Sequence, residues 1–394
     1  MYLFVNKFNK DSLLININLN YLSKILLINL CCMKKFIFIV LIINLSCSPS
    51  CDQQFINKFV DGNAKLLNTI KDNDIQIKLT VIDSIGNFFE YEYNIDAKRY
   101  FYPASTVKLP IALFALEKLN ENDILSIDTP FMLEDDTLKT TFKNELEKVF
   151  VLSDNQANNR FFEFIGQDYI NKKFISKGFF NSTIFHRLST INSSNLEGKR
   201  VDFFINDSII SFQNTNQKPK KLQLEKIKKG KGYINSTGEM IKQEMDFSEK
   251  NYMSITDLHR IMKILFFPEK FNEDERFNLT SKQREILFNY MSGYPKDFGY
   301  SPEEFPYYFT KFFIYGDKEL ELDENIIIHN KVGLAYGQLS DVAYIKNKNI
   351  SIILTATIDV NTNNIYNDDT YEYDSIGFPF LAEISREIIN KLSK

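Results

Sequence analysis

Apolar positions along the chain follow two different periodicities, and their order predicts how the protein folds. Apolar and polar residues alternate, or apolar residues run together, as expected of strands, in residues 75–82, 88–93, 326–330, 339–346 and 350–358. Apolar residues recur every three to four positions, as on one face of a helix, in residues 52–73, 105–119, 142–152, 157–165, 255–266, 281–291 and 378–392. Strands therefore lie near both ends of the chain, and helices fill its middle.

This order of elements predicts an α+β fold with one antiparallel sheet. The sheet would be formed from both chain ends and packed with helices, while the middle, roughly residues 120–295, would fold as a helical lobe. About residues 192–250, polar and lysine-rich sequence interrupts the helical pattern, which we interpret as a solvated insertion rather than a binding patch. We expect residues 52–394 to form one domain that contains this insertion.

Composition and charge narrow the classes of function. The chain has 394 residues, 44% of them hydrophobic, so it can bury a sizeable core. Its net charge of −4 argues against a nucleic-acid partner held through phosphates. The three histidines, His186, His259 and His329, are scattered without the spacing of metal ligands, so we expect no metal and no cofactor.

The cysteines belong to a targeting segment. All four lie early in the chain, at Cys31, Cys32, Cys47 and Cys51, which excludes a disulfide framework or a cysteine nucleophile from the remainder. Met33 and two lysines precede the apolar run 36–45, which is the layout of a secretory signal peptide. We interpret residues 1–51 as a signal or lipoprotein segment.

The end of the apolar run resembles the lipobox of bacterial lipoproteins. Leu45-Ser46-Cys47 fits this pattern, although Asn44 stands where an apolar residue is usual. The resemblance implies lipid on Cys47, with Cys51 as an alternative and an uncleaved anchor as a further one. Residues 1–32 would be an upstream extension. In each case the catalytic part would be exported, to the periplasm or to a membrane surface that it reaches through its anchor.

A candidate nucleophile and base stand at the beginning of the predicted helix 105–119. Ser105 and Lys108 are three positions apart, so both side chains lie on one helical face and the amine can reach the hydroxyl. A serine needs such a base to become nucleophilic, and a lysine can serve if burial or nearby positive charge lowers its pKa. Ser-x-x-Lys alone is a weak signal, because it occurs by chance on many surface helices.

Two further motifs strengthen this signal. Ser153-Asp154-Asn155 lies between two predicted helices, and Lys331-Val332-Gly333 lies at the end of a predicted strand. With Ser-x-x-Lys they resemble the Ser-x-x-Lys, Ser-Asp-Asn and Lys-Thr-Gly signatures of class A β-lactamases and penicillin-binding proteins, in the same order and structural contexts. The resemblance covers roughly residues 55–394.

The resemblance implies an acyl-serine mechanism. Ser105 would be acylated, Lys108 would be its general base, and Ser153 would relay a proton to the leaving nitrogen. Among the residues that would bind substrate, Asn155 would hydrogen-bond its amide side chain, and Lys331 would supply positive charge near its carboxylate. The backbone N–H groups of Ser105 and Leu334 would form the oxyanion hole, and Gly333 would leave room at the strand edge.

Two departures from the family pattern bear on turnover. Val332 replaces a hydroxyl residue that helps to bind a β-lactam carboxylate, and valine cannot donate a hydrogen bond; packing in a strand would also explain it. The family's loop glutamate, which activates water for deacylation, has no match in residues 185–197. Glu197 is the nearest acidic residue and is the candidate deacylation base. Without such a base, the acyl-enzyme should persist.

Three functions therefore remain open. The first is a class A β-lactamase-like serine hydrolase acting on β-lactams or related amides. The second is a cell-wall peptidase or esterase of the same fold. The third is a surface lipoprotein that binds ligand without catalysis, against which the intact motifs argue. The expected partners are a small-molecule β-lactam or cell-wall peptide and a membrane, and we expect a monomer.

Overall fold

The computed structural model describes residues 53–62 and 74–393. The chain divides into two units, residues 1–48 and 49–394, and every described residue belongs to the second unit. The predicted signal segment 1–51, with its lipidation site Cys47, lies outside the described residues and stays a prediction. Among the described helices, none is both long enough and apolar enough to cross a membrane.

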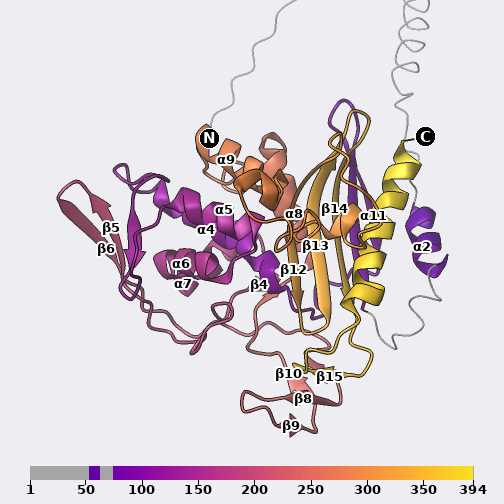
Figure 1. Cartoon of the computed structure of the whole chain (residues 1–394), viewed down its shortest axis with the longest axis horizontal. Coiled ribbons are helices and arrows are strands. Elements are labelled where there is room, and N and C mark those ends of the chain that lie inside the picture. Colours follow the sequence, from indigo (N-terminus) through magenta and orange to yellow (C-terminus); the bar gives the residue numbers. More distant parts are fainter. Residues whose placement is uncertain (1–52, 63–73, 394) are drawn as a thin grey trace, which may run out of the picture. The chain divides into compact units, whose positions relative to one another are not determined.

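A five-stranded antiparallel sheet is built from both ends of the second unit (Figure 1). Its order is β12-β13-β14-β1-β2, so the late strands continue directly into the early ones. The strands are β12 (Ile327–Ala335), β13 (Gln338–Lys346), β14 (Ser351–Asp359), β1 (Gln76–Ile82) and β2 (Phe88–Tyr93). The predicted α+β fold is confirmed, and β12 forms one free edge of the sheet.

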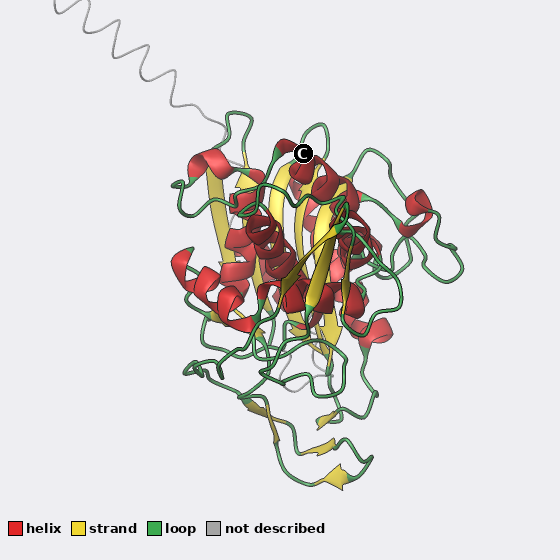
Figure 2. Ribbon diagram, turned by 90° about the vertical axis from the view of Figure 1, so that its left-hand side faces the viewer, coloured by secondary structure: helices red, strands yellow, loops and turns green. Residues whose placement is uncertain are grey.

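Helices cover both faces of this sheet. α8 (Ile255–Phe266) packs on β1, β13 and β14 from the side of the helical lobe. α11 (Phe378–Leu392) covers the other face, where Phe380, Leu381 and Ile384 join the strand residues in a second apolar cluster (Figures 1 and 2). α2 (Gln53–Gly62) contacts β2. Each face of the sheet therefore contributes to its own core.

The predicted helical lobe forms around α4 (Lys108–Leu119), which is buried along nearly its whole length. Phenylalanine rings fill much of the space beside it, for example Phe142, whose ring lies 5.0 Å from that of Phe161. Thr141, Asp154 and Ser254 accept hydrogen bonds from the first turns of α5, α6 and α8, which explains where these helices begin. The other lobe helices are α5 (Phe142–Val151), α6 (Asn155–Ile165), α7 (Gln167–Ser176) and α9 (Ser281–Ser292).

The insertion at 192–250 contains more structure than its polar sequence predicts. β5 (Val201–Ile205) and β6 (Ser208–Phe212) form a hairpin on β3 (Phe131–Leu133), and the ring of Phe203 in it is fully buried. A second group of strands lies apart from the main sheet in Figure 1 and includes β15, which returns from the C-terminal part. Its strands are β7 (Lys228–Lys229), β8 (Gly232–Ile234), β9 (Met240–Ile241), β10 (Met245–Asp246) and β15 (Ile365–Tyr366).

Two boundaries differ from the sequence prediction at positions that matter for the site. β12 does not end at Asn330 but continues through Lys331-Val332-Gly333 to Ala335, because its pairing with β13 is unbroken past the glycine. Ser105 lies in a 3₁₀ turn rather than in an α-helix that begins there. The remaining short elements are η1 (Ala104–Val107), β4 (Ser182–Thr183), β11 (Tyr252–Met253), η2 (Pro268–Lys270), η3 (Pro295–Phe298), α10 (Phe312–Tyr315) and the π-helical turn η4 (Tyr373–Gly377).

Candidate active site

The turn η1 presents Ser105 at the beginning of α4. Ala104, just before it, has a φ of +46°, a conformation that costs energy for a residue with a side chain. The turn is held by Thr106, whose backbone N–H and hydroxyl both donate to the carbonyl of Pro103, at 3.0 and 2.7 Å. Lys108, the first residue of α4, is completely buried. A strained, fixed turn therefore holds the serine beside a buried amine.

The loop between α5 and α6 presents Ser153. This residue also has a positive φ, +56°. Asp154 next to it caps α6, because its carboxylate accepts a hydrogen bond from the Ala157 N–H at 2.7 Å. The Asp154 N–H donates in turn to the carbonyl of Lys148 in α5, at 3.0 Å. The Ser-Asp-Asn motif thus fixes a tight joint that turns Ser153 away from both helices.

Two lysines from distant parts of the chain converge on Ser153. Lys331 Nζ donates to Ser153 Oγ at 2.7 Å, and Lys108 Nζ lies 3.3 Å from the same oxygen. Lys108 also donates to the backbone carbonyl of Ser153. Within the described chain, both hydrogen bonds of Lys108 go to Ser153 and neither goes to Ser105. The sequence predicts a hydrogen bond between Ser105 and Lys108. In the structure, Lys108 instead contacts Ser153, which also accepts the hydrogen bond from Lys331.

Burial lowers the pKa of both amines. Burial lowers the pKa of Lys108 to about 7, although nearby Asp154 opposes this. Burial also holds the pKa of Lys331 well below its usual value, and the positive charges of Lys108 and Lys311 add to the effect. Near neutral pH, one of these amines is therefore available as a proton acceptor.

A buried polar network supports Lys331 from behind the strand. The side-chain oxygen of Asn330 accepts from Lys311 Nζ at 2.7 Å, and its amide nitrogen donates to Asp341 at 2.9 Å. Asp341 also accepts from the backbone N–H of Phe313, at 3.2 Å. Burial raises the pKa of Asp341 to about 6 and lowers that of Lys311 to about 7. These contacts fix the backbone of β12 where Lys331 leaves it.

Gly333 is required by a close approach between β12 and the serine turn. A Cβ atom at this position would lie 2.3 Å from the carbonyl oxygen of Pro103 and 2.9 Å from Ser340 Oγ. Any side chain would push the strand away from η1. The glycine therefore keeps the backbone of Leu334, the next residue, near Ser105.

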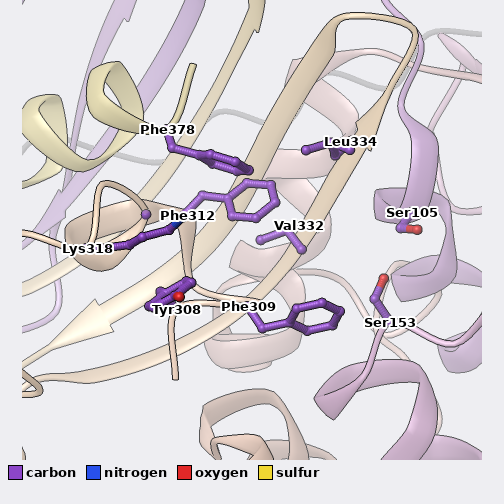
Figure 3. A pocket seen from close by; sticks show the side chains of 10 residues that line it. Ser105, Ser153, Tyr308, Phe309, Phe312, Lys318, Val332, Leu334 and Phe378 are labelled. Carbon is purple, nitrogen blue, oxygen red and sulfur yellow. The ribbon is translucent and has the colours of Figure 1, made fainter. Parts of the chain in front are cut away.

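Two cavities meet at Leu334, which lines both. The first has a volume of about 330 Å³ and is lined by Ser105, Ser153 and several aromatic side chains (Figure 3). The second has a volume of about 490 Å³ and a more polar lining, which includes Tyr102 and Ser189. Asn155 donates to Ser189 Oγ at 3.0 Å, so the predicted amide-binding residue borders the second cavity.

The aromatic wall of the first cavity was missed by the sequence analysis. Six of the nine residues 305–313 are aromatic, a density that could have drawn attention to the segment. Tyr308, Phe309 and Phe312 from this segment line the cavity. They follow neither a helical nor a strand period, so no predicted element included them.

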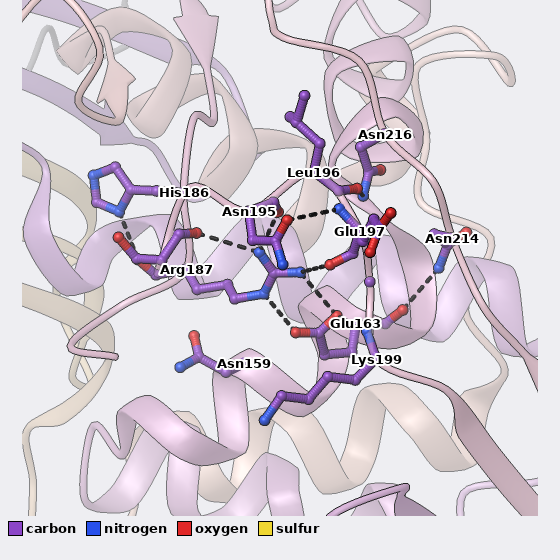
Figure 4. Close-up of polar contacts among 12 residues, drawn as sticks. Asn159, Glu163, His186, Arg187, Asn195, Leu196, Glu197, Lys199, Asn214 and Asn216 are labelled. Atoms are coloured by element: carbon purple, nitrogen blue, oxygen red, sulfur yellow. Dashed lines mark hydrogen bonds and ion pairs between the residues drawn. The ribbon is translucent and has the colours of Figure 1, made fainter. Parts of the chain in front are cut away.

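Glu197 lies away from Ser105. Its side chain is exposed and lines a separate cavity with Asn159 and Glu163. Its backbone carbonyl accepts from Arg187 at 3.3 Å, and Arg187 also forms a buried ion pair with Glu163 (Figure 4). This ion pair anchors the loop of residues 185–197, which contains Glu197. No aspartate or glutamate is among the described residues that line the cavity with Ser105.

The described residues form no cluster of histidine, cysteine, aspartate or glutamate that could hold a metal ion. His186 and His329 are both buried. Burial lowers the pKa of His329 to about 3 and that of His186 to about 4. The predicted site residues Ser105, Lys108, Ser153 and Lys331 come together without them.

Comparisons with known proteins place this geometry in context. A sequence model of the beta-lactamase enzyme family matches residues 63–392. The beta-lactamase of Sphaerobacter thermophilus has a similar structure, with a TM-score of 0.51 and 13% identity over 87% of this chain and 98% of that one. The TLA-1 extended-spectrum beta-lactamase has a TM-score of 0.51 and 14% identity, over 85% and 99%. These structural similarities show the fold. No curated protein matches the chain.

Proposed function

This chain belongs to the beta-lactamase enzyme family, and we propose that it is a serine hydrolase that forms an acyl-enzyme on Ser105. The observation that carries the proposal is the convergence at Ser153. Its hydroxyl accepts a hydrogen bond from Lys331 at 2.7 Å and lies 3.3 Å from Lys108, in the cavity that Ser105 also lines. A ligand-binding protein without catalysis would have no need of two buried amines at one hydroxyl.

Lys108 would take the proton of Ser105 as the serine attacks the substrate carbonyl. A pKa of about 7 leaves a substantial fraction of this amine neutral at physiological pH. The proton would then pass through Ser153 Oγ, to which Lys108 is already linked, and reach the leaving nitrogen or oxygen. Lys331, on the other side of that hydroxyl, would stabilise its transient negative charge.

The tetrahedral intermediate would be stabilised by the backbone N–H groups of Ser105 and Leu334. The close approach of β12 to η1, which Gly333 permits, supports this pairing. One such donor typically contributes about 3–4 kcal/mol to transition-state stabilisation. Asn155 would orient the acyl part of the substrate from the border of the second cavity.

Deacylation would be slow, because the first cavity has no carboxylate in its described lining that could activate water. Glu197, the candidate taken from the sequence, is exposed and lines a different cavity. The enzyme would therefore accumulate as its acyl form with β-lactams.

The apolar run 36–45 and Cys47 support export as a lipoprotein, which acts at a membrane surface on β-lactams or cell-wall peptides. Expression in a bacterium that processes lipoproteins should place the protein in the membrane fraction. Cys47→Ala should abolish this fractionation while Cys51→Ala should not, and the opposite result would reassign the lipidation site.

Labelling with a fluorescent penicillin and with a fluorophosphonate tests the acyl-serine mechanism. The adduct should be found by peptide mapping on Ser105, and Ser105→Ala should lose it entirely while keeping the thermal stability of the unaltered protein. Intact mass followed over time would measure how long the adduct lasts. An unlabelled protein would support the binding function instead.

A further inference from the structure

The cavity in front of Ser105 is polar on one side and apolar on the other. Figure 3 shows the Ser105 and Ser153 side chains on one side of it and the rings of Phe309, Phe312 and Phe378 on the other. Tyr308, Val332 and Leu334 complete much of the apolar wall. Phe309 and Leu334 are each 39% exposed, so both rims of the apolar wall are open to a ligand.

If Asn155 and Ser153 have the roles proposed above, this apolar cavity is on the leaving-group side of the bond that Ser105 would attack. Asn155, which would hold the acyl part, hydrogen-bonds Ser189 at the border of the second cavity. Ser153, which would protonate the leaving atom, lines the first cavity. Leu334 lines both and marks the position of the carbonyl between them. The acyl part therefore faces the polar cavity, and the leaving part faces the apolar one.

Little in the apolar cavity would stabilise a negative charge on the leaving part. Lys331 is not among the residues that line it, and its amine donates to Ser153 Oγ and to the carbonyl of Val332, at 2.7 and 3.1 Å. Lys318 is the one cation among the described lining residues, and its side chain is half exposed, so water weakens its attraction for a carboxylate. The side chain of Val332 offers only methyl groups. A carboxylate held here would lose part of its hydration and would gain at most a solvent-exposed cation.

We infer, on the basis of the proposed function, that the preferred substrates of this acyl-serine site are esters or amides whose leaving part is uncharged and apolar, such as an aryl or bulky alkyl ester. β-Lactams, which place a carboxylate on that side, would still acylate Ser105 but more slowly. In the acylation step, the bond from Ser105 Oγ to the acyl carbon forms and the bond from that carbon to the leaving oxygen breaks. The serine proton passes to Lys108 and, through Ser153, to the leaving oxygen, so that a neutral alcohol departs.

Two esters with one acyl group provide the test. Phenyl acetate and 3-carboxyphenyl acetate carry leaving groups of similar reactivity, and they differ in the charge that would enter the cavity. We expect kcat/KM for phenyl acetate to be higher by about tenfold or more, as for a group that matches an apolar pocket. Equal rates, or a preference for the carboxylate, would overturn the inference.

Variants locate the preference in the cavity. Phe309→Ala should reduce the ratio of the two rates, and Val332→Thr should reduce it by favouring the carboxylate. The matched control is Phe180→Ala, because Phe180 is 65% exposed and does not line the cavity. Thermal melting would establish that each variant is folded. An unchanged ratio in both cavity variants would contradict the assignment.

These outcomes separate the inference from the proposed function. If Ser105 is phosphonylated by the fluorophosphonate and acylated by penicillin, and both esters react with a preference for the carboxylate, the inference is wrong and the acyl-serine mechanism stands. If no acyl-Ser105 forms with any reagent, the proposed function fails and the inference fails with it.

Discussion

Two of the regions in which this molecule buries lysines compensate them in opposite ways. At the site, Lys108 and Lys331 share the hydroxyl of Ser153, and no carboxylate accepts a hydrogen bond from either amine within the described chain. At the ends of the inner strands β1 and β14, Lys229 lies between two carboxylates, 2.8 Å from Asp74 and 3.5 Å from Asp359.

The difference appears in the ionisation of the groups. In the second region, burial alone would raise the pKa of Asp74, but Lys229 and Lys226 hold it below its usual value. At the site, burial lowers the pKa of Lys108 to about 7 against the opposing charge of Asp154. In the Lys229 cluster, Asp74 keeps its charge through its two cations, while burial raises the pKa of Asp359 to about 6. At the site, where no described carboxylate accepts a hydrogen bond from either amine, it is a lysine whose pKa comes close to neutral.

Removing the Lys108 amine should have the largest effect on activity. Lys108→Ala should slow acylation of Ser105 by about 10²–10⁴, the usual contribution of a general base. The rate would be measured by quenching the reaction of the protein with a fluorescent penicillin at successive times and quantifying the labelled protein. Lys118→Ala, on the same helix but 10 residues further on, is the control. A loss of less than tenfold would mean that Lys331, and not Lys108, is the general base.

Removing a lysine from each region should separate stability from activity. Lys229→Met leaves buried Asp359 without its cation and Asp74 with Lys226 alone, so the free energy of unfolding should fall by about 3 kcal/mol. Lys331→Met removes an uncompensated buried amine, so the free energy of unfolding should change by no more than about 1 kcal/mol while acylation is lost. Denaturant unfolding would measure both. Equal destabilisation would show that Lys331 is a structural lysine as well.

The pH dependence of acylation should report the lowered pKa of Lys108. The amine accepts a proton only when it is neutral, so the rate should be constant well above pH 7 and fall by about tenfold per pH unit below it. The measurement is the labelling rate from pH 5.5 to 9, with circular dichroism at each pH to establish that the protein stays folded. A midpoint near 10, the value of an exposed lysine, would contradict the lowered pKa.

Much of the fold could be predicted because its periodicities are strong. The predicted segments 88–93, 255–266 and 378–392 coincide with β2, α8 and α11. Short strands within 192–250 could not be predicted, because segments of two to five residues carry too little periodicity and are stabilised by pairing with distant strands such as β15.

The site was only partly visible in the sequence. The motifs indicated which residues to consider, and Ser153 and Lys331 do lie together. The partner of Lys108 could not be inferred, since it depends on the positive φ of Ser153 and on the 3₁₀ turn at Ser105. The apolar cavity depends on the packing of α10 and α11, which no local pattern specifies.

The smallest effect is expected from Glu197→Gln, which tests whether the Glu197 carboxylate helps to deacylate Ser105. The Glu197 side chain is exposed and lines a different cavity from Ser105, and its backbone contacts to Arg187 do not depend on the carboxylate. The lifetime of the acyl-enzyme should therefore change by less than about twofold, whereas loss of a true base would lengthen it by about 10²–10⁴. A single-turnover time course with intact-mass detection measures this lifetime.

Glu239→Gln, the same change at an exposed carboxylate of the insertion, is the matched control. A lifetime lengthened only in Glu197→Gln would show that the loop moves its carboxylate to Ser105 after acylation. The cavity in front of Ser105 would then contain the carboxylate that its described lining lacks.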